Sequence, residues 1–177
     1  MNRFSRWTFG LAVTALFCMM SVGCVFNAAT LKNVSKFEEI PVAFEHKWEE
    51  NTHPFSGAAV IDVNSDGKME IFVGGGMGQA DVLLSYRDKQ LVDIIEDSGL
   101  SSLSATYGSV SIDIDNDNDV DLIVARDDGL YQYLNQEGKF IEKRISLVLP
   151  NDSVPFSVAV SDIDHDGDAD LYVSVFV

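Results

Sequence analysis

The sequence predicts an all-β protein built from repeated units, and two observations carry that prediction. Beyond Pro54, short runs rich in Val, Ile, Phe and Tyr alternate with clusters of Asp, Asn and Gly, as strands alternate with tight turns. Three windows also align position by position: AVIDVNSDGKMEIFV from Ala59, VSIDIDNDNDVDLIV from Val110 and AVSDIDHDGDADLYV from Ala159. Their first aspartates are 51 and then 49 residues apart, so one strand–loop–strand unit recurs about every 50 residues.

The composition agrees with a folded, strongly acidic domain. The 177 residues are 46% hydrophobic and include 11 Phe and 5 Tyr, which is enough apolar material for a core. Twelve basic and 28 acidic side chains give a net charge of −16. This charge argues against nucleic acids and anionic lipid surfaces as partners, and it favours cations or basic partners.

Residues 1–23 are predicted to be an export signal rather than part of the fold. Arg3 and Arg6 precede the uncharged apolar run TFGLAVTALFCMMSVG, which is too short to span a bilayer comfortably. The following Ser21-Val22-Gly23-Cys24 resembles the lipobox of bacterial lipoproteins, which implies lipidation of Cys24. Cleavage by ordinary signal peptidase and an uncleaved anchor remain open, and each of the three places the chain outside the cytoplasm, as an outer-membrane or cell-surface lipoprotein or a secreted protein.

Residues 24–53 are predicted to be a polar tether that contains one strand. Within IPVAFEHKW, apolar side chains alternate at Ile40, Val42 and Phe44, with Trp48 as a further member. The repeats then occupy residues 54–177.

Each repeat carries carboxylate or amide side chains at odd positions, counted from its first aspartate. Oxygen ligands at positions 1, 3 and 5, a backbone carbonyl at position 7 and a carboxylate at position 9 can surround one hard cation, with a left-handed residue at position 6 making the bend. The predicted metal-site residues are Asp62, Asn64, Asp66, Lys68 and Glu70 in the first loop; Asp113, Asp115, Asp117, Asp119 and Asp121 in the second; and Asp162, Asp164, Asp166, Asp168 and Asp170 in the third. A single such loop could be a metal-free acidic turn, but three aligned copies argue for a site.

Calcium is the predicted cation, about one per repeat and three in this chain. It accepts six to eight oxygens in flexible geometry, whereas magnesium requires a stricter octahedron. Zinc is disfavoured because no cysteine is near and His165 stands at an even position. An EF-hand is excluded because position 12 is Val73, Val124 and Val173, and because β-branched residues rather than helices flank the loops.

This strand, D-x-[DN]-x-D-[GN]-x-x-[DE] loop and strand pattern resembles the FG-GAP/VCBS repeat of integrin-alpha-type β-propellers. Phe55-Ser56, Tyr107-Gly108 and Phe156-Ser157 echo the Phe-Gly pair of that repeat, and residues 130–140 are similar to an outer-strand segment of the bacterial branch related to cartilage acidic protein and ASPIC-UnbV proteins. The resemblance implies four-stranded antiparallel blades whose calcium loops join the first two strands.

On this pattern, residues 81–86 and 91–95 supply the outer strands of the first blade, and 130–134 and 139–145 those of the second. The chain would then hold about two and a half blades of a larger propeller, which predicts a longer protein. The strand at 40–48 could close the ring.

The predicted function is a calcium-binding extracytoplasmic module that binds an unknown protein or glycan or serves as a cell-surface scaffold. It contacts no nucleic acid, and it reaches a membrane only through the N-terminal lipid. No H-E-x-x-H, G-x-S-x-G or phosphate-loop pattern occurs, which leans against an enzyme. Two alternatives remain: the propeller is the non-catalytic part of a larger secreted enzyme acting on polysaccharide or phospholipid, or its central channel is itself catalytic.

Overall fold

The computed structural model describes residues 39–47 and 55–177, and all the elements below belong to one compact unit, Ile40–Val177. The predicted signal segment and Cys24 lie outside the described residues. Within the part of the chain that is described, no helix is long and apolar enough to cross a membrane.

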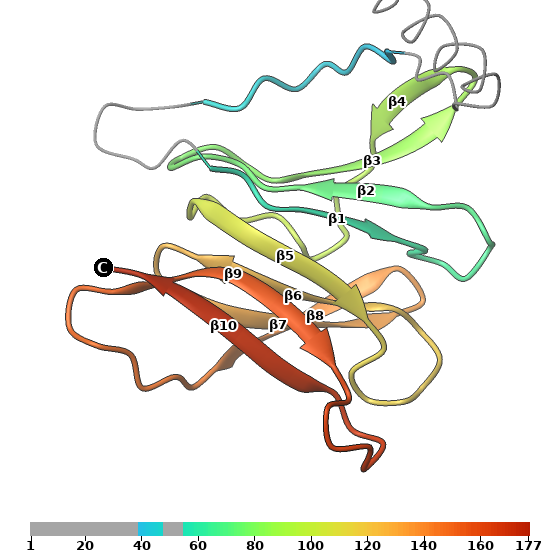
Figure 1. Ribbon diagram of the computed structural model, residues 1–177. Coiled ribbons are helices and arrows are strands. Elements are labelled where there is room, and N and C mark those ends of the chain that lie inside the picture. Colours follow the sequence, from blue (N-terminus) through green and yellow to red (C-terminus); the bar gives the residue numbers. More distant parts are fainter. Residues whose placement is uncertain (1–38, 48–54) are drawn as a thin grey trace, which may run out of the picture. The chain divides into compact units, whose positions relative to one another are not determined.

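The described residues form three antiparallel sheets in which strands follow one another in sequence order (Figure 1). The first sheet contains β1 (Ala58–Ile61), β2 (Glu70–Val73), β3 (Val82–Arg87) and β4 (Gln90–Asp93); the second contains β5 (Thr106–Ile112), β6 (Asp121–Arg126), β7 (Gly129–Gln136) and β8 (Lys139–Ile145); the third contains β9 (Val154–Ser161) and β10 (Asp170–Phe176). The prediction of an all-β fold with four-stranded units is confirmed, and the sheets are consistent with propeller blades.

Strand β6 explains how the sheets stack. All six of its residues are buried, because its two faces pack against different neighbours. Leu122 and Val124 join a core with Ile61, Phe72 and the rest of the first sheet's inner face. Ile123 and Ala125 on the other face pack against side chains of β9 and β10. Burial on both faces explains why the sequence of this strand contains a continuous apolar run and does not alternate between apolar and polar residues.

The aromatic residues of the three Phe-Gly-like pairs gather at one place. Phe55 and Phe156 meet edge to face with ring centroids 4.9 Å apart, and Tyr107 lies 5.9 Å from Phe156. Small residues beside them let successive sheets approach. A Cβ on Gly57 would lie 2.7 Å from the backbone of Gly108. The chain just before β1 and the strands β5 and β9 therefore approach one another closely at this point.

A buried polar network also joins the first sheet to the second. Arg126 on β6 donates through Nη1 to Asp81 Oδ2 at 2.8 Å and to Thr106 Oγ1 at 2.9 Å. Its Nη2 donates to the Tyr133 hydroxyl at 3.0 Å. Asp81 is fully buried and Arg126 is 1% exposed. Both terminal nitrogens of Arg126 have partners, whereas its buried Nε has none in the protein. The network can occupy the interface because the two opposite charges of Arg126 and Asp81 lie against each other.

Residues 39–47 contain no strand, in contrast to the expectation for the segment that begins at Ile40. Ile40 and Val42, whose alternation suggested a strand, are both exposed. The backbone here bonds to a side chain instead of a sheet edge: Gln79 Nε2 donates to the Glu45 carbonyl at 2.8 Å, and the Lys47 N–H donates to Gln79 Oε1 at 2.7 Å. Trp48 lies outside the described residues, and a role in ring closure stays a prediction.

Candidate metal centre

The three acidic loops each connect the first two strands of a sheet, as the repeat predicted. Loop 1 spans residues 62–69, loop 2 spans 113–120 and loop 3 spans 162–169. In every sheet the residue before position 1 pairs with the residue at position 9, in the pairs Ile61–Glu70, Ile112–Asp121 and Ser161–Asp170. The strand ladder therefore closes all three loops at the same length and brings their first and last acidic positions together.

The backbone of each loop turns through two left-handed residues. Position 6 has φ of 80° at Gly67, 74° at Asn118 and 95° at Gly167, which confirms the predicted bend. Position 4 is left-handed as well, at Ser65, Asn116 and His165. The sequence did not indicate this second bend, because residues of these types also occur in ordinary turns.

The acidic side chains bind the backbone of their own loop. Position 1 accepts the N–H of position 6 in every copy, at 2.8 Å from Gly67, 3.0 Å from Asn118 and 3.2 Å from Gly167. The position 5 carboxylate accepts the N–H of position 7 at 2.8 to 3.0 Å. These bonds turn the carboxylates inward, so the loop geometry that a cation needs exists in the protein chain itself.

Loops 2 and 3 bring three carboxylates into one cluster. Asp113, Asp115 and Asp117 each place an oxygen within 4.8 Å of the others, and Asp162, Asp164 and Asp166 do the same. Loop 1 has Asp62 and Asp66 at the equivalent places, with Asn64 between them. Like charges this close repel one another unless a cation lies between them.

One oxygen in loop 3 supports this requirement directly. Asp162 Oδ1 is buried and has no hydrogen-bond partner in the protein. Its equivalents in the other loops, Asp62 Oδ1 and Asp113 Oδ1, accept the N–H of position 5. A buried carboxylate oxygen without a partner is costly. The hard oxygen donors and this unpaired atom fit a divalent cation in the loop.

The position 9 carboxylates lie outside the two clusters and hold the base of each loop. Each accepts the N–H of position 2: Glu70 from Val63 at 3.3 Å, Asp121 from Ile114 at 2.8 Å and Asp170 from Ile163 at 2.8 Å. Burial raises the pKa of Asp121, and the N–H groups that it accepts act in the opposite direction. Position 9 thus connects the loop to the sheet.

Two contacts distinguish the position 7 side chains. Lys68 Nζ pairs with Asp66 Oδ2 at 3.1 Å, and the backbone N–H and side chain of Lys68 lower the pKa of Asp66. In loop 2, Asp119 Oδ1 accepts the Ser65 hydroxyl at 3.0 Å, so loops 1 and 2 touch. The sequence pattern predicted only that the backbone carbonyl of position 7 would face the cation. It contains no signal for either of these side-chain contacts.

Asn135, on β7, is a further structural residue of these loops. Its Nδ2 donates to the carbonyls of Val63 in loop 1 and Val120 in loop 2, at 2.9 and 3.1 Å. Its backbone N–H donates to Asp121 Oδ1 at 2.7 Å. The sequence shows Asn135 inside an outer-strand motif, with no signal that it reaches two loops.

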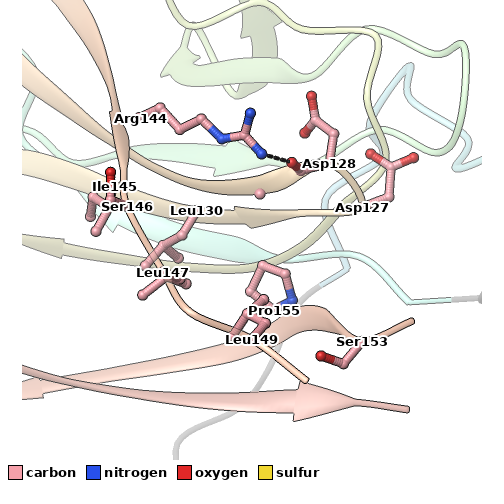
Figure 2. A pocket seen from close by; sticks show the side chains of 11 residues that line it. Asp127, Asp128, Leu130, Arg144, Ile145, Ser146, Leu147, Leu149, Ser153 and Pro155 are labelled. Atoms are coloured by element: carbon pink, nitrogen blue, oxygen red, sulfur yellow. Dashed lines mark hydrogen bonds between the residues drawn. The ribbon is translucent and has the colours of Figure 1, made fainter. Parts of the chain in front are cut away.

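A separate cavity of about 440 Å³ lies where the β6–β7 turn and β8 face the segment leading to β9. Figure 2 shows Leu130, Leu147 and Pro155 along one side, with Asp127, Asp128 and Arg144 on the other. Arg144 donates to the Asp128 carbonyl. Burial raises the pKa of Asp127. None of the predicted metal-site residues lines this cavity.

The sheets and loops together define a protein of repeated antiparallel β-units, each with an acidic loop after its first strand. A family model described as FG-GAP-like repeat matches residues 62–124 and again residues 113–173. The two matches cover more than half of the chain, and the protein belongs to this repeat family. No curated protein matches the chain.

Proposed function

We propose that the protein is a calcium-stabilised β-propeller module that acts outside the cytoplasm, where it binds a protein or glycan or serves as a surface scaffold. The observation that carries the proposal is the recurrence of one loop geometry three times, twice with three carboxylates within 4.8 Å of one another. Carboxylates this close to one another repel, and a cation shared between their oxygens removes that repulsion.

Calcium suits the loops better than other cations. The donors are carboxylate, amide and carbonyl oxygens on short loops, with backbone turns that can adjust to six or more ligands. Extracellular calcium modules bind at about 10⁻⁴ to 10⁻³ M, so these loops would fill where calcium is abundant. The chain's export-type N-terminus and its net charge of −16 support an extracytoplasmic place and a role for cations.

The cation in this proposal orders the loops, and recognition of a partner falls to other parts of the blades. The finer resemblance to the VCBS and cartilage acidic protein branch supports a surface-exposed binding protein, and lipidation at Cys24 would tether it. In the alternative, the propeller is the non-catalytic part of a larger secreted enzyme that acts on polysaccharide or phospholipid. The calcium loops are the same in both proposals, and only the rest of the protein differs.

The test compares thermal stability with and without calcium. With a Kd of 10⁻⁴ to 10⁻³ M, about 10 mM calcium stabilises the folded state by about 1.4–2.7 kcal/mol for each filled loop. The variant Asp115→Ala with Asp117→Ala should therefore lower the melting temperature measured by circular dichroism in calcium, but little in chelator.

A matched variant controls for net charge. Glu39→Ala with Glu96→Ala also removes two exposed carboxylates, and it should leave the calcium-dependent rise in melting temperature intact. Equal losses for the loop variant in calcium and in chelator would show that its aspartates stabilise the loop without a metal, and the proposal would fail.

A further inference from the structure

The three loops differ in charge although they share one backbone. Between positions 1 and 9, loop 1 has three acidic residues and Lys68, a net charge of −2, whereas loops 2 and 3 each have five aspartates and no Lys or Arg, a net charge of −5 with histidine neutral. Position 3 contributes to the difference, because Asn64 is neutral where Asp115 and Asp164 are charged. The number of charged ligands is one of the quantities that sets calcium affinity in loops of this kind.

Loop 1 also contains a positively charged side chain, Lys68. Lys68 Nζ lies 3.1 Å from Asp66 Oδ2, while Asp66 Oδ1 accepts the Lys68 N–H at 2.9 Å. Both oxygens of the position 5 carboxylate are therefore bonded to the same residue. Within the described part of the chain, no ion pair forms inside loop 2 or loop 3, where Asp119 and Asp168 replace Lys68.

A second positive charge reaches loop 1 through its position 9 residue. Glu70 Oε1 accepts the Ser85 hydroxyl at 3.0 Å, and Ser85 Oγ in turn accepts Arg87 Nε at 3.3 Å. Lys68, Glu70 and Arg87 line one cavity of about 370 Å³ beside the loop. Loop 1 thus has part of its negative charge balanced by the protein, whereas Asp162 Oδ1 in loop 3 has no partner.

We propose that the three loops bind calcium unequally: loops 2 and 3 fill first, loop 1 fills at least about tenfold more weakly, and Lys68 contributes the largest part of this difference. The inference rests on the calcium-binding function proposed above. A divalent ion entering loop 1 must displace the ammonium from Asp66, and it meets two fewer carboxylates than in either other loop, in a loop whose net charge is less negative by three. The first sheet would then keep its loop ordered by Lys68 when calcium is scarce.

Calorimetric titration of the full chain with calcium, after removal of bound metal by chelation, measures the sites. The expected isotherm shows two calcium ions bound at high affinity, the tight equivalents, and then a third bound at lower affinity, the weak step. Asp62→Ala with Asp66→Ala should remove the weak step alone. Asp115→Ala with Asp117→Ala should remove one tight equivalent and leave the weak step.

The variant Lys68→Asp gives loop 1 the position 7 residue of the other two loops. Lys68→Asp should raise the calcium affinity of the weak step about tenfold, and Lys68→Gln should raise that affinity by less. Lys143→Asp on β8 makes the same change in net charge on an exposed strand and should leave the weak step within about twofold. The circular dichroism spectrum of each variant in chelator shows whether it is folded, and Lys68→Gln keeps the test available if Lys68→Asp is not.

The outcomes separate the two proposals. Three equal sites in the unmodified chain, or equal effects of Lys68→Asp and Lys143→Asp, would overturn the inequality while leaving calcium binding in place. A folded chain that gives no calcium heat and no calcium-dependent rise in melting temperature would overturn calcium binding itself, and the inequality with it.

Discussion

Removal of both members of the Asp81–Arg126 pair should destabilise the protein about as much as removal of one, and not by the sum of the two single losses. Asp81 precedes β3 in the first sheet and Arg126 ends β6 in the second, so the pair reports on the contact between the two sheets. Asp81 accepts three hydrogen bonds, from Gly75 N at 2.8 Å, Thr106 Oγ1 at 3.0 Å and Arg126 Nη1 at 2.8 Å. None of these groups has ready access to water.

The magnitude follows from burial. Asp81→Ala leaves the guanidinium of Arg126 buried without its counter-charge, which costs about 3–5 kcal/mol. Arg126→Met fills a similar volume but leaves the Asp81 carboxylate facing only two neutral donors, and a similar cost is expected. The double variant buries neither charge, so its loss should be about that of one single variant. The coupling energy between the two positions is then about 3 kcal/mol.

Urea unfolding followed by circular dichroism measures the free energies of the four proteins. Asp81→Asn is the milder single variant if Asp81→Ala is unfolded in buffer, and Glu96→Ala, an exposed carboxylate, should change stability by less than about 0.5 kcal/mol. Losses of the two single variants that simply add up in the double variant would refute the idea of a buried, mutually dependent pair.

The pH dependence of Arg126→Met provides an independent check on the same pair. Burial raises the pKa of Asp81, and Arg126 is the main group that opposes this rise. Without Arg126 the folded-state pKa rises further above the unfolded value of about 3.9. A raised pKa gives stability that is present at low pH and is lost as the pH rises through the folded value. The defect of Arg126→Met should therefore be smaller near pH 5 than at pH 7.

Two further predictions concern the interfaces between sheets. Burial raises the pKa of Tyr133, so the folded protein retains a proton that the unfolded chain releases above about pH 10, and stability should fall by up to about 1.4 kcal/mol per pH unit there. Urea midpoints from pH 8 to 11 measure this fall; an identical fall in Tyr133→Phe would assign it to other groups. Gly108→Ala places a Cβ 2.6 Å from the Phe156 carbonyl oxygen and should cost about 1–3 kcal/mol in urea unfolding, an estimate that an unchanged midpoint would contradict.

The repeats made the fold predictable because local pattern and tertiary contact agree in them. Each strand pair is joined by one short loop whose Asp and Gly positions are visible in the sequence, and the outer strands expected at 81–86 and 139–145 correspond to β3 and β8. The segment at residues 40–47 shows the limit. Alternation of Ile40, Val42 and Phe44 is a necessary feature of a half-buried strand, but a strand also needs a free edge to pair with. Here the Gln79 side-chain amide, and not a strand edge, bonds the backbone of this segment. No local sequence pattern indicates that contact.

The spacing of the acidic side chains in the loops was predictable from the sequence, but the contacts between the loops were not. Spacing placed the acidic side chains at positions 1, 3 and 5 because the turn is local. The bond from Asn135 to Val63 joins residues 72 positions apart, and the bond from Ser65 to Asp119 joins residues 54 apart. Such contacts depend on how one sheet lies against the next, which periodicity does not specify.

Asp121 and Asn135 connect loop 2 both to β7 and to loop 1. Asp121 closes loop 2 by accepting the Ile114 N–H, and its other oxygen accepts the backbone N–H of Asn135. The Asn135 amide then holds a carbonyl of loop 1. A cation that orders loop 2 would therefore steady Asp121, and through Asn135 the base of the neighbouring loop. Since the same two sheets also bury the Asp81–Arg126 pair, the contact between them depends on polar groups whose partners lie on the opposite sheet. Apolar packing draws the sheets together without direction, and these bonds determine which register of one sheet against the other is stable.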